Sequence, residues 1–221
     1  MVLIQEGEFV MGFNEGAENQ KPEHKVYLKT FYIDVHEITN AEYSLFNPSH
    51  QSSLSRAPNM PVTDISYEEA VAYCNWRTMH EPGRFRLPTE AEWEHAARGK
   101  ENNLYSYGDF YDKKLANTDN TERDASPVEI QKYSPNSYSL YDMTGNVAEW
   151  VSDYYDPKYY EECSKKGCVT NPQCPREKRP HKVIRGGSFK SDRDSSQATA
   201  RRHAPPNSSF EDVGFRCVRE P

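Results

Sequence analysis

The stretch Phe85-Arg-Leu-Pro-Thr-Glu-Ala-Glu-Trp-Glu-His-Ala-Ala-Arg-Gly99 carries the clearest helix start and stop signals in the chain. Thr89 precedes the helical residues, and Glu92 lies three positions further on, which is the spacing of a capping box. Gly99 follows the last helical residue and suits a helix end, because glycine accepts a left-handed backbone. The sequence therefore predicts a short helix over 90–98.

The same capping pattern occurs twice more upstream. Thr39 and Glu42 form one pair, Ser66 and Glu69 form another, and each pair heads a stretch with helical spacing. Residues 25–33 alternate between polar and apolar side chains, and this alternation predicts a strand. We therefore expect early strands followed by three short helices.

Beyond residue 100 the helical spacing is lost. This part of the chain is rich in Tyr, Asn, Asp and Pro, and its apolar runs are short. The stretches typical of strands are 138–141, 147–151, 182–185 and 214–218. The sequence thus predicts an α+β fold in a single domain over 1–221, with a loop-rich second half and a last strand that returns to the early sheet.

The composition limits the function classes. The 221 residues carry 27 Lys and Arg against 34 Asp and Glu, a net charge of −7, and only 35% are hydrophobic. An acidic chain argues against general nucleic-acid binding, and no apolar run reaches the roughly 20 residues of a membrane helix. Aromatic residues make up 12%, which is too many for a disordered chain. We expect an aromatic core whose buried hydroxyl and ionic groups are hydrogen-bonded.

The cysteines bear on the cellular compartment, and they are Cys74, Cys163, Cys168, Cys174 and Cys217. The three in the polar loop lack the C-x2-C spacing of zinc sites, so a local disulfide in an oxidising compartment is the better interpretation. Three pairings fit this loop, and we prefer Cys163–Cys168. No signal segment opens the chain, so either the protein is cytosolic or its targeting segment lies outside this stretch.

The most informative polar stretch is Tyr141-Asp-Met-Thr-Gly-Asn-Val-Ala-Glu-Trp150. The spacing brings side-chain oxygens of Asp142, Asn146 and Glu149 close together around a turn that Gly145 allows. Hard oxygen ligands of this kind suit Ca²⁺. The alternative is a turn whose Asp and Asn side chains cap their own backbone.

A second polar patch begins at Asn117-Thr118-Asp119-Asn120 and continues with Glu122 and Asp124. It suits either calcium or a solvated acidic loop. No catalytic signature accompanies these patches, because the sequence lacks a G-x-S-x-G elbow, a Walker loop, a Cys–His nucleophile signature and the His spacing of a metal site. Gly186-Gly187-Ser188 is a poor phosphate loop, since no helix is predicted after it.

Several blocks together resemble the formylglycine-generating enzyme family, also called the sulfatase-modifying-factor domain. They cover nearly the whole chain and occur in the order of the family. The blocks are Met1–Ile4 with Gly7–Gly12, Val35–Asn40 with Tyr43, Phe85–Glu94 with Ala96–Gly99, Tyr141–Trp150, Arg185–Phe189 and Val213–Cys217. The resemblance implies a variant C-type-lectin-like fold with little regular secondary structure.

The resemblance also implies structural calcium. Carried over residue by residue, the first family site falls on two acidic side chains and two backbone carbonyls, and the second starts in the other polar patch. The positions are Asp142, Gly145, Val147 and Glu149 for the first site, and Asn117 and Thr118 for the second. We therefore expect calcium as a structural cofactor.

A disulfide of the family enzyme links the second helix to the last strand, and its positions match Cys74 and Cys217. Such a bridge would close a loop of about 140 residues and stabilise the fold by several kcal/mol in the chain-entropy model. The resemblance therefore favours an extracytoplasmic location, periplasmic or secreted, with the signal segment outside this stretch.

The chain departs from the family after Gly186-Gly187-Ser188. The formylglycine-generating oxidase has two cysteines there that bind Cu(I), and this soft ion requires thiolates. Here Ser191 and Ser196 fall near those positions, and no cysteine occurs between residues 174 and 217. We expect neither copper nor copper-dependent oxidase activity.

Two functions fit this pattern. The first is a calcium-stabilised binding or accessory module for a protein, peptide or glycan, presented by loops over 100–136 and 155–212. Its ligand groove is marked by three serines and by an alanine that stands where many relatives carry Trp: Ser188, Ser191, Ser196 and Ala148. The alternative is an enzyme of the same family with a non-copper or iron-dependent oxidative or maturation chemistry. Neither function predicts nucleic-acid binding or membrane insertion.

Overall fold

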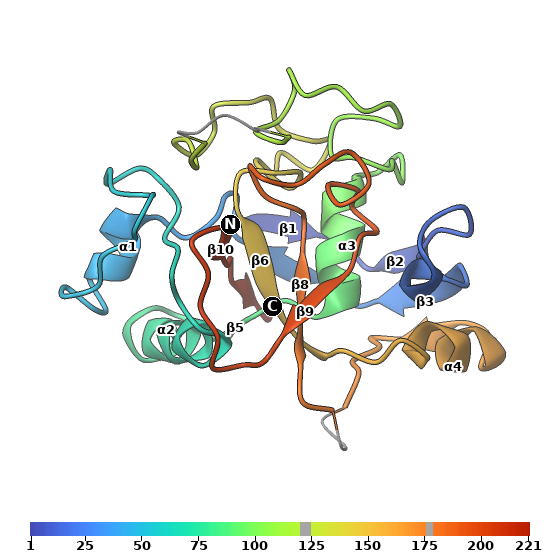
Figure 1. Ribbon diagram of the computed structural model, residues 1–221. Coiled ribbons are helices and arrows are strands. Elements are labelled where there is room, and N and C mark those ends of the chain that lie inside the picture. Colours follow the sequence, from blue (N-terminus) through green and yellow to red (C-terminus); the bar gives the residue numbers. More distant parts are fainter. Residues whose placement is uncertain (120–124, 176–178) are drawn as a thin grey trace.

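The computed structural model describes residues 1–119, 125–175 and 179–221. Short helices and strands alternate along these ranges, and long loops connect them (Figure 1). The helices are α1 (Asn40–Ser44), α2 (Tyr67–His80), α3 (Glu90–Arg98) and α4 (Tyr159–Lys165), with a 3-10 turn, η1, at Glu18–Gln20. This α+β, loop-rich arrangement confirms the predicted fold class.

The strands in the described ranges form three sheets. The first sheet has the order β1 (Val2–Ile4), β4 (Phe31–Ile33), β11 (Val218–Arg219) and β5 (Phe85–Arg86). The second has the order β10 (Val213–Gly214), β6 (Ala148–Tyr154), β8 (Lys182–Arg185) and β9 (Arg202–Ala204). The third has the order β2 (Gly7–Met11), β3 (His24–Leu28) and β7 (Val169–Thr170). Because β11 pairs with β4, the last strand returns to the early sheet as predicted.

All three predicted helix starts are confirmed. Thr39, Ser66 and Thr89 each accept a hydrogen bond from the backbone N–H three residues further on, and the Glu side chain at that position bonds back to the backbone of the cap. Gly99 follows α3 with a φ of 69°, a conformation that glycine adopts without steric cost. Local sequence signals therefore decide where these helices begin and where α3 ends.

Two predicted strands differ in the structure. Residues 138–141 form a turn, because the Asn136 side chain accepts hydrogen bonds from the backbone N–H groups of Tyr138 and Leu140. Residues 214–218 are divided between β10 and β11, which belong to different sheets. The three residues between them cross from one sheet to the other, and a periodicity argument does not detect such a crossing.

The sequence also missed α4 and read β3 and β4 as one strand. The α4 helix begins after Lys158, whose side chain makes no capping bond, so the usual start signal is missing. Between β3 and β4, the Lys29 backbone N–H donates to the Asn171 side chain. The strand pattern is thus interrupted by a contact from a distant loop.

The core contains two clusters of buried side chains, and each includes a tryptophan. Trp93 of α3 packs in the cluster with β2 and β3, and Trp150 of β6 packs in the cluster with α2. Figure 1 shows α3 beside β6 and β8, with the loops over 100–145 above them. Arg185 and Arg216 are among the largest fully buried side chains, which confirms the expected core of aromatic and ionic groups.

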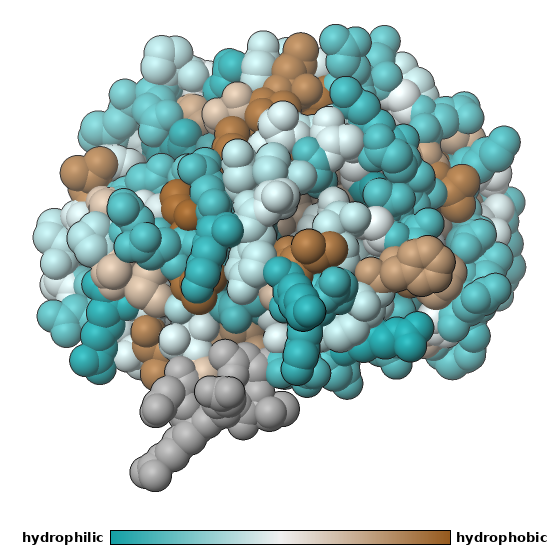
Figure 2. Space-filling model, turned by 90° about the horizontal axis from the view of Figure 1, so that it is seen from above, coloured by the Kyte–Doolittle hydropathy of each residue, from teal (hydrophilic) through white to brown (hydrophobic). Residues whose placement is uncertain are grey.

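The surface agrees with the low mean hydropathy of −0.97. Seen from above, hydrophilic residues cover most of the molecule, and hydrophobic residues are scattered between them (Figure 2). Within the described ranges, no helix has both the length and the apolar character needed to cross a bilayer.

Candidate functional site

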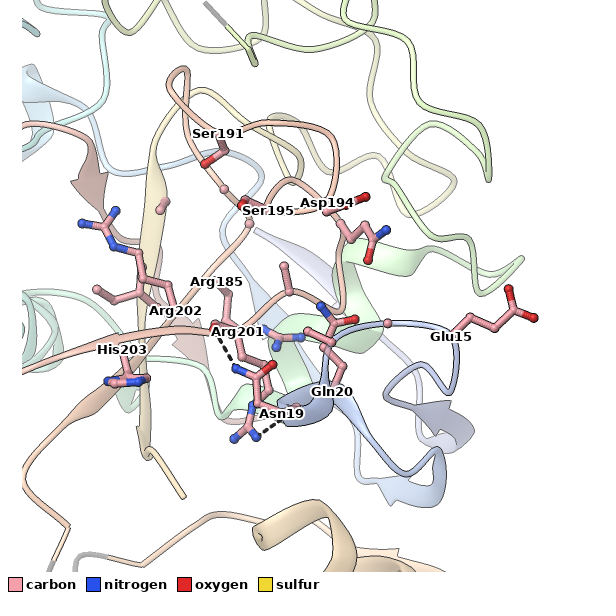
Figure 3. A pocket seen from close by; sticks show the side chains of 18 residues that line it. Glu15, Asn19, Gln20, Arg185, Ser191, Asp194, Ser195, Arg201, Arg202 and His203 are labelled. Atoms are coloured by element: carbon pink, nitrogen blue, oxygen red, sulfur yellow. Dashed lines mark hydrogen bonds between the residues drawn. The ribbon is translucent and has the colours of Figure 1, made fainter. Parts of the chain in front are cut away.

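A cavity of about 720 Å³ opens between the turn before β3 and the chain from β8 to β9. Residues within 15–20 line one side, residues within 184–203 line the other, and Ala148 of β6 completes the lining. We call this cavity the main groove. Figure 3 shows Asn19 and Gln20 close to Arg201, with Ser191, Ser195 and Asp194 on the opposite loop.

The structure separates the four residues that the sequence placed in a ligand groove. Ala148 and Ser191 line the main groove. Ser188 and Ser196 are buried and outside its lining. The Ser188 hydroxyl donates to Asp212 at 2.9 Å, and the Ser196 hydroxyl donates to the backbone carbonyl of Asp192 at 2.7 Å. Their polar groups are therefore occupied by the protein itself.

A buried ion-pair network lies beneath the main groove. Arg201 binds both carboxylate oxygens of Glu90, at 2.7 and 2.9 Å. Arg185 bridges Glu90 at 3.1 Å and Glu94 at 2.5 Å, and Arg98 contacts Glu94 at 3.4 Å. We call these five residues the arginine network. It connects α3 to β8 and to the far wall of the groove, so the groove is built on a fixed base.

The electrostatics of the network follow from its pairing. Burial by itself raises the pKa of Glu90, but Arg201 and Arg185 outweigh it and hold that pKa below its usual range. Asp153 accepts the Glu90 backbone N–H, and burial together with the Glu90 charge raises the pKa of Asp153 to about 7. Glu90 inside the network thus remains ionised, while Asp153 beside it has a pKa close to neutral pH.

Two side chains of the main groove keep hydrogen-bonding groups that the described residues do not use. Gln197 lines the groove, and its amide makes no hydrogen bond within the part of the chain that the structure describes but stays accessible to solvent. Arg185 Nε, also in the lining, is buried without a partner in the described ranges. At the mouth, Arg202 pairs with Asp212 at 2.9 Å, and His203 contacts His181 at 3.0 Å between Nδ1 atoms. The groove therefore offers an accessible amide and a buried guanidinium N–H inside, and cationic or titratable groups at its edge.

The two predicted calcium positions lie next to each other in the structure. Gly145 has a φ of 80°, and a Cβ there would lie 2.4 Å from the carbonyl oxygen of Asn117 and 2.5 Å from Thr118. Asn146 joins the two segments, because its backbone N–H donates to the Asn117 carbonyl at 2.9 Å. Of the second patch, residues 120–124 lie outside the described ranges, so Asn120, Glu122 and Asp124 are not placed.

The carboxylates around this turn are unequally neutralised. Glu149 is paired with Arg216 at 2.8 Å and accepts the Trp93 indole N–H at 2.8 Å. Glu37 accepts the Asn146 amide at 3.0 Å through one oxygen, and its Oε2 is buried without a partner in the described ranges. Asp142 accepts the backbone N–H of Gln131. We call Glu37, Asp142, Glu149 and Arg216 the acidic turn.

Burial raises the pKa of Glu37 well above its usual range, and the neighbouring Asp142 raises it further. The pKa of Asp142 is also raised, mainly by burial. In the described ranges, no group of three or more His, Cys, Asp or Glu side chains converges as a ready metal site. A cation at the turn would therefore depend on backbone carbonyls such as those of Gly145 and Val147, and it would share Glu149 with Arg216.

Sequence reasoning did not single out Glu37, Arg216 or the arginine network. Each of these residues except Arg201 lies in a block that resembles the family, such as Val35–Asn40 or Val213–Cys217. A charged residue at a position of a strand or helix that faces the core could have indicated these ion pairs. Charged side chains are rarely fully buried unless they are paired. Their partners are not visible in one sequence.

All five cysteines are free thiols in this structure. Cys74 and Cys217 are buried neighbours, since a hydrogen bond from the Cys217 thiol to Cys74 contributes, after burial, to the raised pKa of Cys217. Cys163 is buried in α4, whereas Cys168 is exposed and contacts Glu8 at 3.9 Å. The Cys74–Cys217 and Cys163–Cys168 bridges stay predictions.

Comparison with known proteins places the chain. Residues 1–221 match the model of the sulfatase-modifying factor enzyme 1-like domain. The chain is 33% identical to the serine/threonine-protein kinase pkn1 of Chlamydia pneumoniae, over 99% of this chain but only 38% of the kinase. It is 29% identical to the formylglycine-generating enzyme of Streptomyces coelicolor, over 99% of this chain and 88% of that enzyme.

Among solved structures, the chain is similar to Treponema denticola variable protein 1, with a TM-score of 0.89 over 100% of this chain and 95% of that one. Their sequence identity is 23%, so this likeness concerns the fold alone. Two findings indicate the same family: the domain model matches the full stretch, and the chain is similar in sequence to the enzyme and kinase relatives. The chain belongs to the family of sulfatase-modifying factor enzyme 1-like domains.

Proposed function

We propose that this chain is a binding or accessory module whose ligand lies in the main groove. The unpartnered Gln197 amide is the observation that carries the proposal. Because this amide lines the groove and is not used by the described residues, a ligand can bond to it without breaking a hydrogen bond of the protein. The arginine network supports the role, because it fixes the groove before any ligand arrives.

A peptide segment fits the lining better than a glycan. The side-chain amide of Gln197 donates and accepts at once, as a peptide group does. Sugars usually stack on aromatic rings, which offer flat apolar faces, and the described residues that line the groove include no Phe, Tyr or Trp. Arg202 and His203 at the mouth favour a ligand with an acidic group near this end.

The serine positions support binding rather than copper chemistry. Ser191, at the groove wall, and Ser196, beneath it, stand near the family's two cysteines. Hydroxyl oxygens are hard ligands and Cu(I) prefers thiolates, so the donor set does not fit that ion. We therefore propose no copper-dependent oxidase activity for this chain.

We also propose that calcium stabilises the acidic turn. Three buried carboxylates face one guanidinium there, so the turn has more carboxylates than cations. Asp142 and the backbone carbonyls of Gly145 and Val147 would hold the ion. Glu37, whose Oε2 has no partner in the described ranges, adds to the excess of carboxylates. Hard oxygen donors of this kind match calcium. Asn117 and Thr118 would support the ion from the adjacent loop.

The disulfides and the location form one linked proposal. A bridge between Cys74 and Cys217 requires an oxidising compartment, so we propose that the domain works outside the cytoplasm. Mass mapping of non-reduced peptides from protein made in an oxidising compartment should find this link. Free thiols at both positions in such protein would refute the bridge and remove the argument for the location.

The binding role is tested with a displayed library of random 12-residue peptides selected on the immobilised protein. Peptides that are enriched should bind at least tenfold more weakly to Gln197→Leu and to Ser191→Tyr, because the first removes the amide and the second fills the groove. Gln51→Leu, at an exposed position, is the matched control and should bind like wild type. Enriched peptides that bind all variants equally would contradict a ligand in the main groove.

Metal content separates the two function classes. Purified protein should contain calcium and lack stoichiometric iron or copper, as measured by inductively coupled plasma mass spectrometry. Stoichiometric iron or copper, lost in parallel with a measured oxidation reaction, would overturn the binding module in favour of the enzyme.

A further inference from the structure

The first strands of the chain form one long ribbon. β1 pairs with β4 and β2 pairs with β3, and both pairs are antiparallel. The register is the same throughout: Val2 lies opposite Ile33, Gly7 opposite Leu28, and Met11 opposite His24. In each of these pairs the two residue numbers add to 35, so β1 and β2 keep the same register. Between them residues 5–6 are not paired, and the Glu6 N–H donates to the Thr30 side chain at 3.2 Å. β1 and β2 therefore follow one another along the same edge.

The outer side of this edge is open. β1 and β2 are each the terminal strand of their sheet in the described ranges. A cavity of about 770 Å³ runs beside them and is lined by every residue from Val2 to Val10 except Ile4. Its other side consists of His95, residues 99–102 apart from Glu101, and residues 137–139. We call this cavity the edge groove; it shares no lining residue with the main groove.

Backbone groups at one end of the edge already take partners from α3. Arg98 donates to the carbonyls of Val10 and Gly12, at 3.2 and 3.0 Å, and Glu94 accepts the Gly12 N–H at 2.7 Å. In an antiparallel ribbon, alternate residues direct both backbone groups to the same side. Because Val10 and Gly12 point outward, Glu8 does so as well, and its N–H and carbonyl face the edge groove.

The groove also contains polar and aromatic groups suited to a ligand. Asn102 Oδ1 is buried without a hydrogen-bond partner in the described ranges. His95, 8% exposed, lies between Phe9 and Tyr138, with ring centroids 4.7 and 5.6 Å away. The apolar side chains of Leu3 and Val10 are 39% and 37% exposed. An edge strand that leaves such side chains uncovered is a template for strand addition.

We propose that the edge groove receives an extended segment of a protein partner, which adds a strand along residues 2–10 and carries basic side chains opposite Glu6 and Glu8. Nine residues of strand span roughly 30 Å, which matches an extended peptide better than a compact small molecule. Two acidic residues and one cation, Lys100, line the groove, so its charge favours a basic strand. Backbone bonds supply affinity, and alternate side chains supply selectivity.

The probe is the peptide acetyl-(Lys-Val)4-amide, compared with acetyl-(Glu-Val)4-amide and with a Lys-Val peptide in which the two central valines are proline. Labelled peptides are titrated with the whole chain by fluorescence anisotropy. The Lys-Val peptide should bind at least tenfold more tightly than either of the others. In hydrogen exchange, it should slow the amides of Glu8 and Val10.

The double variant Glu6→Lys with Glu8→Lys should weaken the Lys-Val peptide at least tenfold. The matched control, Glu68→Lys with Glu162→Lys, changes the net charge equally at exposed positions on α2 and α4 and should leave binding unchanged. Equal loss in both variants, or equal binding of the proline peptide, would overturn strand addition in favour of general charge attraction.

Sedimentation of the protein alone supplies the remaining outcome. A monomer at the titration concentration keeps the edge free for a partner and supports the proposal. A dimer in which the Glu8 and Val10 amides are protected would overturn it and assign the edge groove to a second copy of the chain.

Discussion

Two buried charged clusters of this molecule differ in how they are balanced. In the arginine network, three guanidinium groups face two carboxylates, and Arg201 with Arg185 holds the pKa of Glu90 low despite full burial. In the acidic turn, one guanidinium faces three carboxylates, and the pKa of Glu37 is raised well above its usual range. Burial imposes a desolvation penalty on the charges of both clusters. The number of arginines decides whether the carboxylates are balanced within the chain. The first cluster is complete within the chain, whereas the second has room for an external cation.

The largest effect should come from breaking the complete cluster. Arg185→Met leaves Glu94 with only its longer ion pair to Arg98 and removes one of the two arginines at Glu90. This should lower the free energy of unfolding by about 3–5 kcal/mol in urea denaturation. Arg202→Met, which removes a partly exposed pair, should cost about 1 kcal/mol or less. Similar losses for the two variants would contradict the view that the network stabilises through paired burial.

The pH dependence of stability due to His95 tests whether the arginines already balance the charge of the neighbouring Glu94. Burial lowers the pKa of His95 to about 4, from about 6.5 in an unfolded chain. The folded-state pKa is the lower one, so stability is fully present above pH 6.5 and is lost as the pH falls toward 4. The loss is up to about 3 kcal/mol. His95→Gln should remove this dependence of stability on pH, and exposed His80→Gln should keep it. If the stability of His95→Gln changes with pH as that of wild type does, then Glu94 keeps the His95 imidazole protonated in the folded state.

Calcium tests the incomplete cluster. At a hundredfold excess over its dissociation constant, a bound ion adds about 2.7 kcal/mol to the free energy of unfolding, so chelator should lower the melting temperature and calcium should restore it. Glu37→Gln should reduce this response, because it removes one of the excess carboxylates, while exposed Glu68→Gln should retain it. Identical melting curves of wild type in chelator and in calcium would show that the acidic turn needs no cation.

The smallest expected loss of stability comes from removing a helix cap. It tests whether the cap of α3 contributes independently of the charged residues on that helix. Thr89→Ala removes the cap of α3 but leaves the pairs of Glu90 intact, so it should cost about 1 kcal/mol. Thr39→Ala, at the start of α1 beside the acidic turn, should cost about the same. A much larger loss at Thr89, measured by the same denaturation curves, would mean that the cap and the arginine network act as one unit.

The predictable part of the fold is local in sequence. Thr39, Ser66 and Thr89 begin helices because each cap and its Glu lie three residues apart, and the bonds between them need no other part of the chain. The α4 helix has no such cap and was missed. The run 214–218 was read as one strand, although Cys217 lies between sheets, because a sheet crossing leaves the alternation of side chains unchanged.

The candidate sites were predicted only in part. Ala148 and Ser191 do line a groove, but Ser188 turns inward to Asp212. The turn around Gly145 was recognised, yet Glu37, which carries the unpartnered oxygen, was not. Its relation to Asn146 spans 109 residues of sequence, and no spacing rule covers such a distance.

The sequence by itself determined the family, the helix starts, and the lack of cysteines near the family's copper positions, because each of these depends on residue type or on neighbours a few positions apart. Only the tertiary structure decided which charges meet. Glu90 and Arg185 are 95 residues apart, and Glu149 and Arg216 are 67 apart. Such pairs form because folding removes both groups from water, and then each charge is stable only beside an opposite one.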